Sequence, residues 1–165
     1  MKNMNLSFLF YFQDILFYIS FIPLIGILLL IFINSEQEQF LKIVALNFSA
    51  LPFFIFLLIW GGFKKSVGTF QFVTKILWIP AMNLNVTLGI DGISLFFLLL
   101  TTLLIPLCIL ISWNSIHSNL KSYLIAFLII EFLLIGVFCI LDILMFYIFF
   151  ESILIPMFLI IGIWG

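Results

Sequence analysis

Residues 143–164 read ILMFYIFFESILIPMFLIIGIW, an apolar run with one acidic side chain, Glu151, near its middle. At about 1.5 Å per residue, a helix of this length spans the hydrocarbon core of a bilayer, which is about 30 Å thick. Glu151 would then lie about midway across the membrane, where an ionisable group costs roughly 2.5 to 3.5 kcal/mol to insert. Such a residue is a functional candidate, and proton transfer is the chemistry expected of it.

The composition of the whole chain is that of an integral membrane protein. Of its 165 residues, 66% are hydrophobic and 8% are charged, and a soluble domain of this size has no core large enough to bury them. The net charge of −1 gives no electrostatic basis for binding nucleic acid. Cys108 and Cys139 fall inside apolar segments, where a thiol packs as a small hydrophobic group. The sequence therefore predicts neither a disulfide nor a metal site.

Five apolar segments are long enough to cross a membrane, and together they predict a single membrane domain over residues 1–165. They are residues 15–33, 40–60, 93–113, 122–141 and 143–164. The predicted fold class is therefore all-α, with about five transmembrane helices. Trp60, Trp113 and Trp164 each close a segment, as interfacial aromatic residues do. Lys42 lies close enough to a segment end for its ammonium group to reach the interface.

The long connection at residues 61–92 predicts a short surface β-hairpin between the second and third helices. Residues 70–79 are rich in β-branched and aromatic types, and the second part of the connection alternates polar and apolar side chains, both of which are typical of strands. Pro80 cannot donate a ladder hydrogen bond and is expected at the turn. Asp91 is expected to be the N-cap of the third helix, and Asp142 that of the fifth.

Glu131 is a second carboxyl group inside a span, at nearly the same depth as Glu151. It lies ten residues before Leu141, and Glu151 lies nine residues after Asp142, which gives depths of about 15 and 13.5 Å. If the two faces meet across this antiparallel pair, the two carboxyl groups share one proton. Alternatively, Glu131 turns toward a polar group of another subunit, and Glu151 is a neutral acid that only hydrogen-bonds between helices.

Three of the prolines inside the predicted helices lie close to polar residues, and each leaves the carbonyl four residues earlier without its helical partner. Pro156 frees the carbonyl of Ser152, next to Glu151, and Pro52 and Pro106 act in the same way in the second and third spans. Because lipid offers no hydrogen-bond partner, a freed carbonyl needs a side chain, water or another helix. We therefore expect water near Glu151, whereas a kink satisfied by packing is an equal alternative at Pro52 and Pro106.

Two stretches carry a resemblance to a known family. One is LGIDGISLFF at residues 88–97, followed by LIPLC at 104–108; the other is LDILMFYIFFE at 141–151, followed by ILIPM at 153–157 and GIWG at 162–165. They closely resemble NADH dehydrogenase (ubiquinone) subunit 4, the antiporter-like, proton-pumping membrane subunit of respiratory complex I, most of all its mitochondrially encoded form. The first two spans match this family only by hydropathy.

The resemblance implies a role for Glu151 and a place in the cell. Glu151 matches the fifth-helix glutamate of the family's proton channel, which works with a lysine on a later helix. Glu131 is a candidate second acid only from its position in the fourth span. The implied location is the mitochondrial inner membrane, with lipid and other membrane-arm subunits as partners. The implied FMN and iron–sulfur clusters belong to other subunits, because this chain has no Gly-x-Gly-x-x-Gly motif, no cysteine cluster and a single histidine, His117, expected in a loop.

The chain departs from the family in ending where the fifth span ends, without the later lysines. We therefore expect either a fragment or one half of a split subunit that a separate C-terminal chain completes. The predicted function is a proton-translocating subunit of NADH:ubiquinone oxidoreductase, with the redox chemistry elsewhere; the alternatives are a cation/proton antiporter subunit and a non-pumping scaffold of the membrane arm. Orientation is open, since the lysines on residues 61–92 favour the matrix side and the resemblance implies the intermembrane space.

Overall fold

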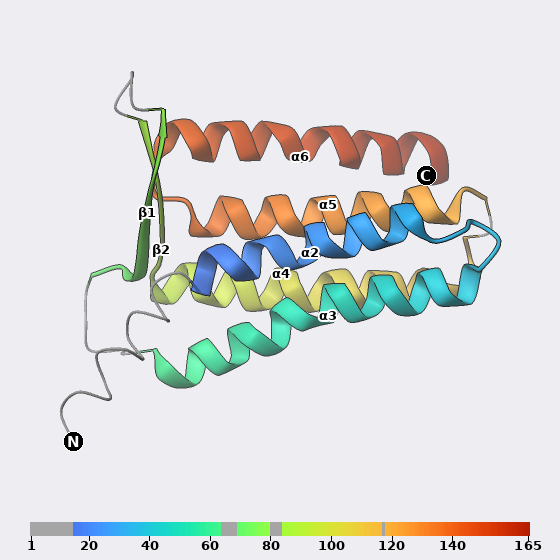
Figure 1. Ribbon diagram of the computed structural model, residues 1–165, viewed down its shortest axis with the longest axis horizontal. Helices are drawn as coiled ribbons and strands as arrows, with labels where there is room; N and C mark the ends of the chain where they lie inside the picture. The colour runs from blue at the N-terminus through green and yellow to red at the C-terminus, as the bar shows by residue number, and fades with distance from the viewer. Residues whose placement is uncertain (1–14, 64–68, 80–83, 117) are drawn as a thin grey trace.

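A computed structural model describes residues 15–63, 69–79, 84–116 and 118–165 of the chain (Figure 1). These residues form five long α-helices and one β-hairpin: α2 (Ile15–Phe32), α3 (Glu38–Gly62), β1 (Gln71–Ile79), β2 (Leu84–Ile90), α4 (Gly92–Ile111), α5 (Leu120–Cys139) and α6 (Ile143–Trp164). All five helices are long and apolar enough to cross a membrane. The predicted fold class is confirmed, and the helix bounds differ from the predicted spans by at most two residues.

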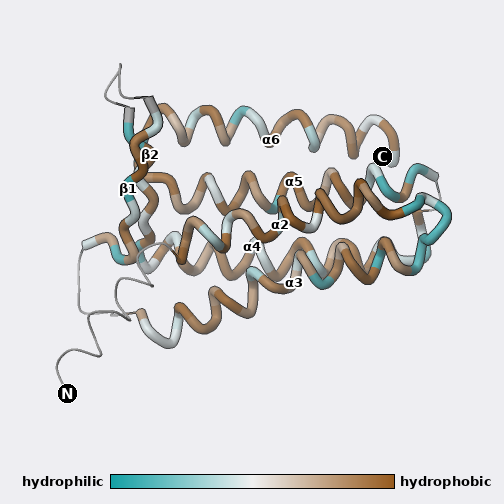
Figure 2. Tube along the Cα trace, viewed as in Figure 1, coloured by the Kyte–Doolittle hydropathy of each residue, from teal (hydrophilic) through white to brown (hydrophobic). Residues whose placement is uncertain are grey.

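The helices run side by side, with the hairpin across one end of the bundle and most polar loop residues at the other end (Figures 1 and 2). Helix α5 is the central element, because it packs against α2, α3, α4 and α6. In the 18-residue apolar stretch of each helix, 56% of the residues are buried in α5 and 17% in α6. Helix α6 lies at one edge of the bundle and packs chiefly against α5, so most of its surface is left for lipid or another protein segment.

The hairpin ties the start of α4 to the connection between α5 and α6. Strands β1 and β2 pair antiparallel, with Thr74 opposite Leu88. Leu88 also forms a bridge with Ile140, and the backbone N–H of Leu141 donates to the carbonyl of Thr87 at 2.9 Å. The predicted hairpin is therefore confirmed, and it fixes the point from which α6 departs. The predicted turn at Pro80 lies outside the described residues.

Helix α4 begins with a complete capping box, as the sequence predicted for its N-cap. The carboxylate of Asp91 accepts from the backbone N–H of Ser94 at 2.7 Å, and the hydroxyl of Ser94 accepts from the backbone N–H of Asp91 at 2.9 Å. Asp142 holds the N-cap position of α6, as predicted, but its side chain makes no capping hydrogen bond within the described residues. Only its backbone takes part in the helix start: the carbonyl of Asp142 accepts from the backbone N–H of Phe146 at 2.9 Å.

Replacing Asp91 by Ala is expected to lower the free energy of unfolding in detergent by about 1 kcal/mol at neutral pH. The hydrogen bonds from the backbone and side chain of Ser94 lower the pKa of Asp91 below its ordinary value of 3.8. Because folding depresses this pKa, the extra stability is present above 3.8 and is lost as pH falls through the folded value. Denaturant unfolding at several pH values measures both effects.

The matched variant for this measurement is Asp91→Asn, which keeps a capping oxygen but cannot titrate. We expect it to retain most of the stability at neutral pH and to remove the acid-dependent part. If Asp91→Ala unfolds like the wild type at neutral pH, the capping box contributes nothing measurable.

At the opposite end of the bundle, two lysines bind helix C-termini instead of reaching into solvent. The ammonium group of Lys42 donates to the backbone carbonyl of Trp113 at 2.7 Å and lies 4.0 Å from a carboxylate oxygen of Glu38. Lys121 donates to the carbonyls of Ile31 and Ile33 at 2.8 and 2.9 Å. Cations are favourable at helix C-termini. The side chain of Lys42 is buried and holds α3 to the end of α4. That its ammonium group lies at the membrane interface stays a prediction.

Candidate functional site

Glu151 lies on the outer side of α6, facing away from the rest of the bundle. The side of α6 that packs on α5 is marked by Phe149, whose ring lies where a Cβ on Gly136 would stand. Successive residues of an α-helix are about 100° apart, so Glu151 projects about 200° from Phe149. Its side chain is exposed on this unpartnered face. In a membrane, such a position faces either lipid or a further protein segment.

The carboxylate of Glu151 has one hydrogen-bond partner, Tyr147, one helical turn earlier. The Tyr147 hydroxyl donates to Oε1 of Glu151 at 2.6 Å. Sequence reasoning missed this tyrosine, although the i,i+4 spacing on a predicted helix places the two side chains on one face. Within the described residues, no lysine forms an ion pair with Glu151. The site therefore holds an acid and a donor that orients it. It is open on its outer side, from which a cation of another protein segment could approach.

Glu131 lies on α5 in a different environment. Its side chain is 1% exposed, and neither carboxyl oxygen has a hydrogen-bond partner among the described residues. On the same side of α5, Leu128 meets Gly26 of α2, and Phe138 stacks on Phe97 of α4 with ring centroids 5.4 Å apart. Glu131 projects between these two contacts, toward the interior that α5 forms with α2, α3 and α4.

The structure does not bring the two acids together. They lie at matching depths, as predicted, since Glu131 is eight residues before the end of α5 and Glu151 eight residues after the start of α6, or about 12 Å each. Their faces differ: one points into the bundle, and the other points away from it. The carboxyl oxygens of Glu131 have no hydrogen-bond partner in the described part of the chain, so the shared-proton arrangement considered for the pair is not formed.

Buried prolines occupy four of the five helices: Pro23, Pro52, Pro106 and Pro156. Pro156 faces α5 and lies in the same helix as Glu151. Near it, the hydroxyl of Ser152 donates to the carbonyl of Ile148 at 2.7 Å. The expected water near Glu151 stays a prediction. Cys139 is fully buried and Cys108 partly buried, both as free thiols, in agreement with the packing role predicted for them. His117 lies outside the described residues.

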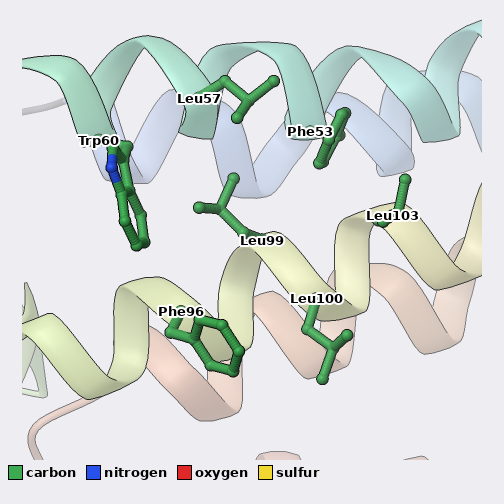
Figure 3. A pocket seen from close by; sticks show the side chains of 7 residues that line it. All are labelled: Phe53, Leu57, Trp60, Phe96, Leu99, Leu100 and Leu103. Atoms are coloured by element: carbon green, nitrogen blue, oxygen red, sulfur yellow. The ribbon is translucent and has the colours of Figure 1, made fainter.

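A groove between α3 and α4 offers no group for acid–base chemistry. It has a volume of about 330 Å³, and its side chains are apolar or aromatic (Figure 3). They are Phe53, Leu57, Trp60, Phe96, Leu99, Leu100 and Leu103. Neither acid lines this groove, so it is separate from the candidate site. The described residues also contain no group of three or more His, Cys, Asp or Glu side chains placed to bind a metal ion.

Several known proteins that are similar in sequence to this chain share one name. No family model matches the chain. It is 59% identical over 146 residues to NADH-ubiquinone oxidoreductase chain 4 of Chondrus crispus, 52% over 143 residues to that of Arabidopsis thaliana and 49% over 159 residues to that of Prototheca wickerhamii. These matches cover 87 to 88% of the chain but only 29 to 30% of each relative.

The matched region is the N-terminal part of these relatives, so the chain spans about 30% of their length. Identities near one half over 140 or more residues are far above what shared membrane composition produces. The chain is therefore homologous to the N-terminal part of NADH-ubiquinone oxidoreductase chain 4.

Proposed function

We propose that this chain forms part of a proton-translocating membrane subunit of respiratory complex I in the mitochondrial inner membrane. The name of its relatives, NADH-ubiquinone oxidoreductase chain 4, supports membership in this complex. The observation that carries the proton-transfer role is Glu151: a carboxyl group midway along a membrane-length helix, oriented by Tyr147 and open to a further partner. An ionisable residue inside a membrane span is by default a candidate for a functional role.

Glu151 acts as a proton relay in this proposal. In an apolar surrounding the neutral acid is favoured, whereas an approaching cation favours the carboxylate. A lysine that moves toward Glu151 and away again therefore drives release and uptake of one proton. No lysine of the described residues forms an ion pair with Glu151, and in this proposal the cation is a lysine of the rest of the subunit, as the resemblance implies. The exposed outer side of α6, with Tyr147, Leu154 and Phe158, is the face against which that remainder packs.

The energy for transport comes from outside this chain. Moving one proton against the membrane potential costs about 2.3 kcal/mol per 100 mV, and no redox group is expected here. FMN and iron–sulfur clusters, together with the reduction of ubiquinone, belong to other subunits of the complex in this proposal. Its partners are those membrane-arm subunits, lipid, and the C-terminal remainder of the subunit, either in one continuous chain or as a second one.

Purification of a tagged form of this chain from its own membranes tests the proposed complex. In mild detergent, we expect NADH:ubiquinone reductase activity, and the FMN that accompanies it, to be enriched together with the tag. Because a tightly held membrane-arm subunit remains bound after a salt wash, the enrichment should survive one. Recovery of the chain in a complex that exchanges sodium for protons and oxidises no NADH would instead support the antiporter alternative.

Replacing Tyr147 by Phe is expected to slow proton translocation about fivefold, the factor that corresponds to a hydrogen bond of about 1 kcal/mol. The substitution removes the donor to Oε1 of Glu151 but keeps the ring. Reconstituted vesicles with a pH-sensitive dye measure the rate. The pH profile of the rate should also shift, which loss of packing alone would not cause. Tyr18→Phe, at an exposed tyrosine on α2, is the control and should leave both the rate and the profile unchanged.

A further inference from the structure

Each of the helices α2 to α5 buries at least one polar side chain inside the bundle. Ser49 on α3 and Thr102 on α4 are fully buried, Glu131 on α5 is 1% exposed, and Ser20 on α2 is 7% exposed. These are the buried polar residues of α2, α4 and α5 in the described part of the chain, and α3 adds only Lys42 near its start. The interior of this four-helix group is therefore not uniformly apolar.

Three of these side chains lie at one level of the bundle. Glu131 and Ser49 each lie 11 residues after the first residue of their helices, and Thr102 lies nine residues before the end of α4. The corresponding distances along the helix axes are about 16.5, 16.5 and 13.5 Å. Helices α3 and α5 begin, and α4 ends, at the same end of the bundle (Figure 1). Since α5 packs against both α3 and α4, Glu131 projects toward the region that holds the two hydroxyls.

The two hydroxyls are available as hydrogen-bond acceptors. Ser49 donates its hydrogen to the carbonyl of Leu46 at 3.1 Å, and Thr102 donates to the carbonyl of Leu98 at 2.6 Å. A hydroxyl whose hydrogen is already donated in one hydrogen bond can still accept another through its lone pairs. More acceptors come from the backbone, because the buried prolines at positions 52 and 106 leave the carbonyls four residues earlier without an N–H partner.

Among the described residues, no cation forms an ion pair with Glu131. Helices α2 and α4 carry no charged residue. On α3 the charged residues are Glu38 and Lys42, and the ammonium group of Lys42 is bound at the carbonyl of Trp113. On α5 the ammonium group of Lys121 is bound at the end of α2, and Glu151 on α6 faces the other way. A buried carboxyl group without a partner charge persists as the neutral acid, which needs an acceptor for its hydrogen.

We propose that Glu131 is a water-linked proton-binding site inside the α2–α5 bundle, separate from Glu151. The site binds one proton on the carboxyl group and at least one water, which accepts from Glu131 and donates to the hydroxyl of Thr102 or Ser49. A bound water is the usual partner of a buried polar group that has none in the protein. The site requires neither α6 nor the remainder of the subunit, so it goes beyond the proposed function and does not depend on it.

Infrared spectroscopy of the chain in its own purified complex at neutral pH tests the site. The carbonyl stretch of a protonated carboxyl group should be present in the wild type and in Glu151→Gln, and it should be lost in the isosteric variant Glu131→Gln. Because a water links the site, the band should shift within minutes of transfer to heavy water. A band that survives Glu131→Gln, or one that resists exchange for hours, overturns the proposal.

A second pair of variants tests the water link without removing the acid. Thr102→Val deletes an acceptor and should shift the Glu131 band, more so in combination with Ser49→Ala. The matched control is Thr101→Val, because the hydroxyl of Thr101 also bonds to carbonyls of its own helix but is not fully buried. An unchanged band in the double variant would sink the water link. Loss of the wild-type band when sodium chloride replaces choline chloride would identify a cation site instead.

Discussion

Replacing Glu151 by Gln is expected to reduce proton translocation by about 10²-fold or more while leaving the complex assembled. The amide keeps the shape of the side chain and still accepts a hydrogen bond from Tyr147, but it cannot take up and release a proton. A positioned proton-transfer group contributes roughly 10² to 10⁴ to a rate, so its loss should dominate any effect on packing. Proton uptake into sealed vesicles per NADH oxidised measures the change directly.

Glu36→Gln is the matched control for this experiment. It makes the same chemical change in the exposed turn between α2 and α3, where water solvates the carboxylate. Normal translocation by Glu36→Gln and loss in Glu151→Gln would place the effect at the membrane acid. Normal translocation by Glu151→Gln with an intact complex would favour the non-pumping scaffold. A loss of sodium-dependent exchange without any change in NADH-driven transport would favour the antiporter subunit.

Replacing Gly26 by Val is expected to lower the free energy of unfolding by about 1 to 3 kcal/mol, the usual cost of overpacking a core. A Cβ at this position would lie 2.7 Å from Cβ of Phe48 and 3.1 Å from Cδ1 of Leu128. At Gly26, α2 is therefore in close contact with side chains of both α3 and α5. Since Phe48 meets the added carbon at its own Cβ, a rotation of its ring cannot relieve the overlap, and a backbone must move.

The control is Gly162→Val, where the same side chain enters α6 with nothing within 4 Å. Glycine is about 1 kcal/mol less favourable than alanine in a helix interior, so this substitution should be neutral or mildly stabilising. Thermal unfolding in detergent, compared for the two variants, separates overlap from helix propensity. Equal stability of Gly26→Val and the wild type would mean that the helix contacts at Gly26 are looser than described.

The sequence by itself determined the helices, the hairpin and the depth of the acids. A run of about 20 apolar residues admits no structure in a bilayer other than a helix, because every backbone group must find its partner within the segment. Asp91 and the alternation before it predicted the start of α4 and the hairpin through local hydrogen-bond chemistry. The equal depth of Glu131 and Glu151 followed from counting residues at a fixed helical rise.

Only the tertiary structure decided which way each helix faces. The spans are apolar on all sides, so they lack the polar stripe from which an amphipathic helix can be oriented by its sequence. The direction of Glu131 into the bundle and of Glu151 out of it depends on contacts such as Gly136 with Phe149 and Gly26 with Phe48. These contacts join residues far apart in the chain, and local patterns carry no information about them. The sequence therefore could predict the depth of the two acids but not whether their side chains meet.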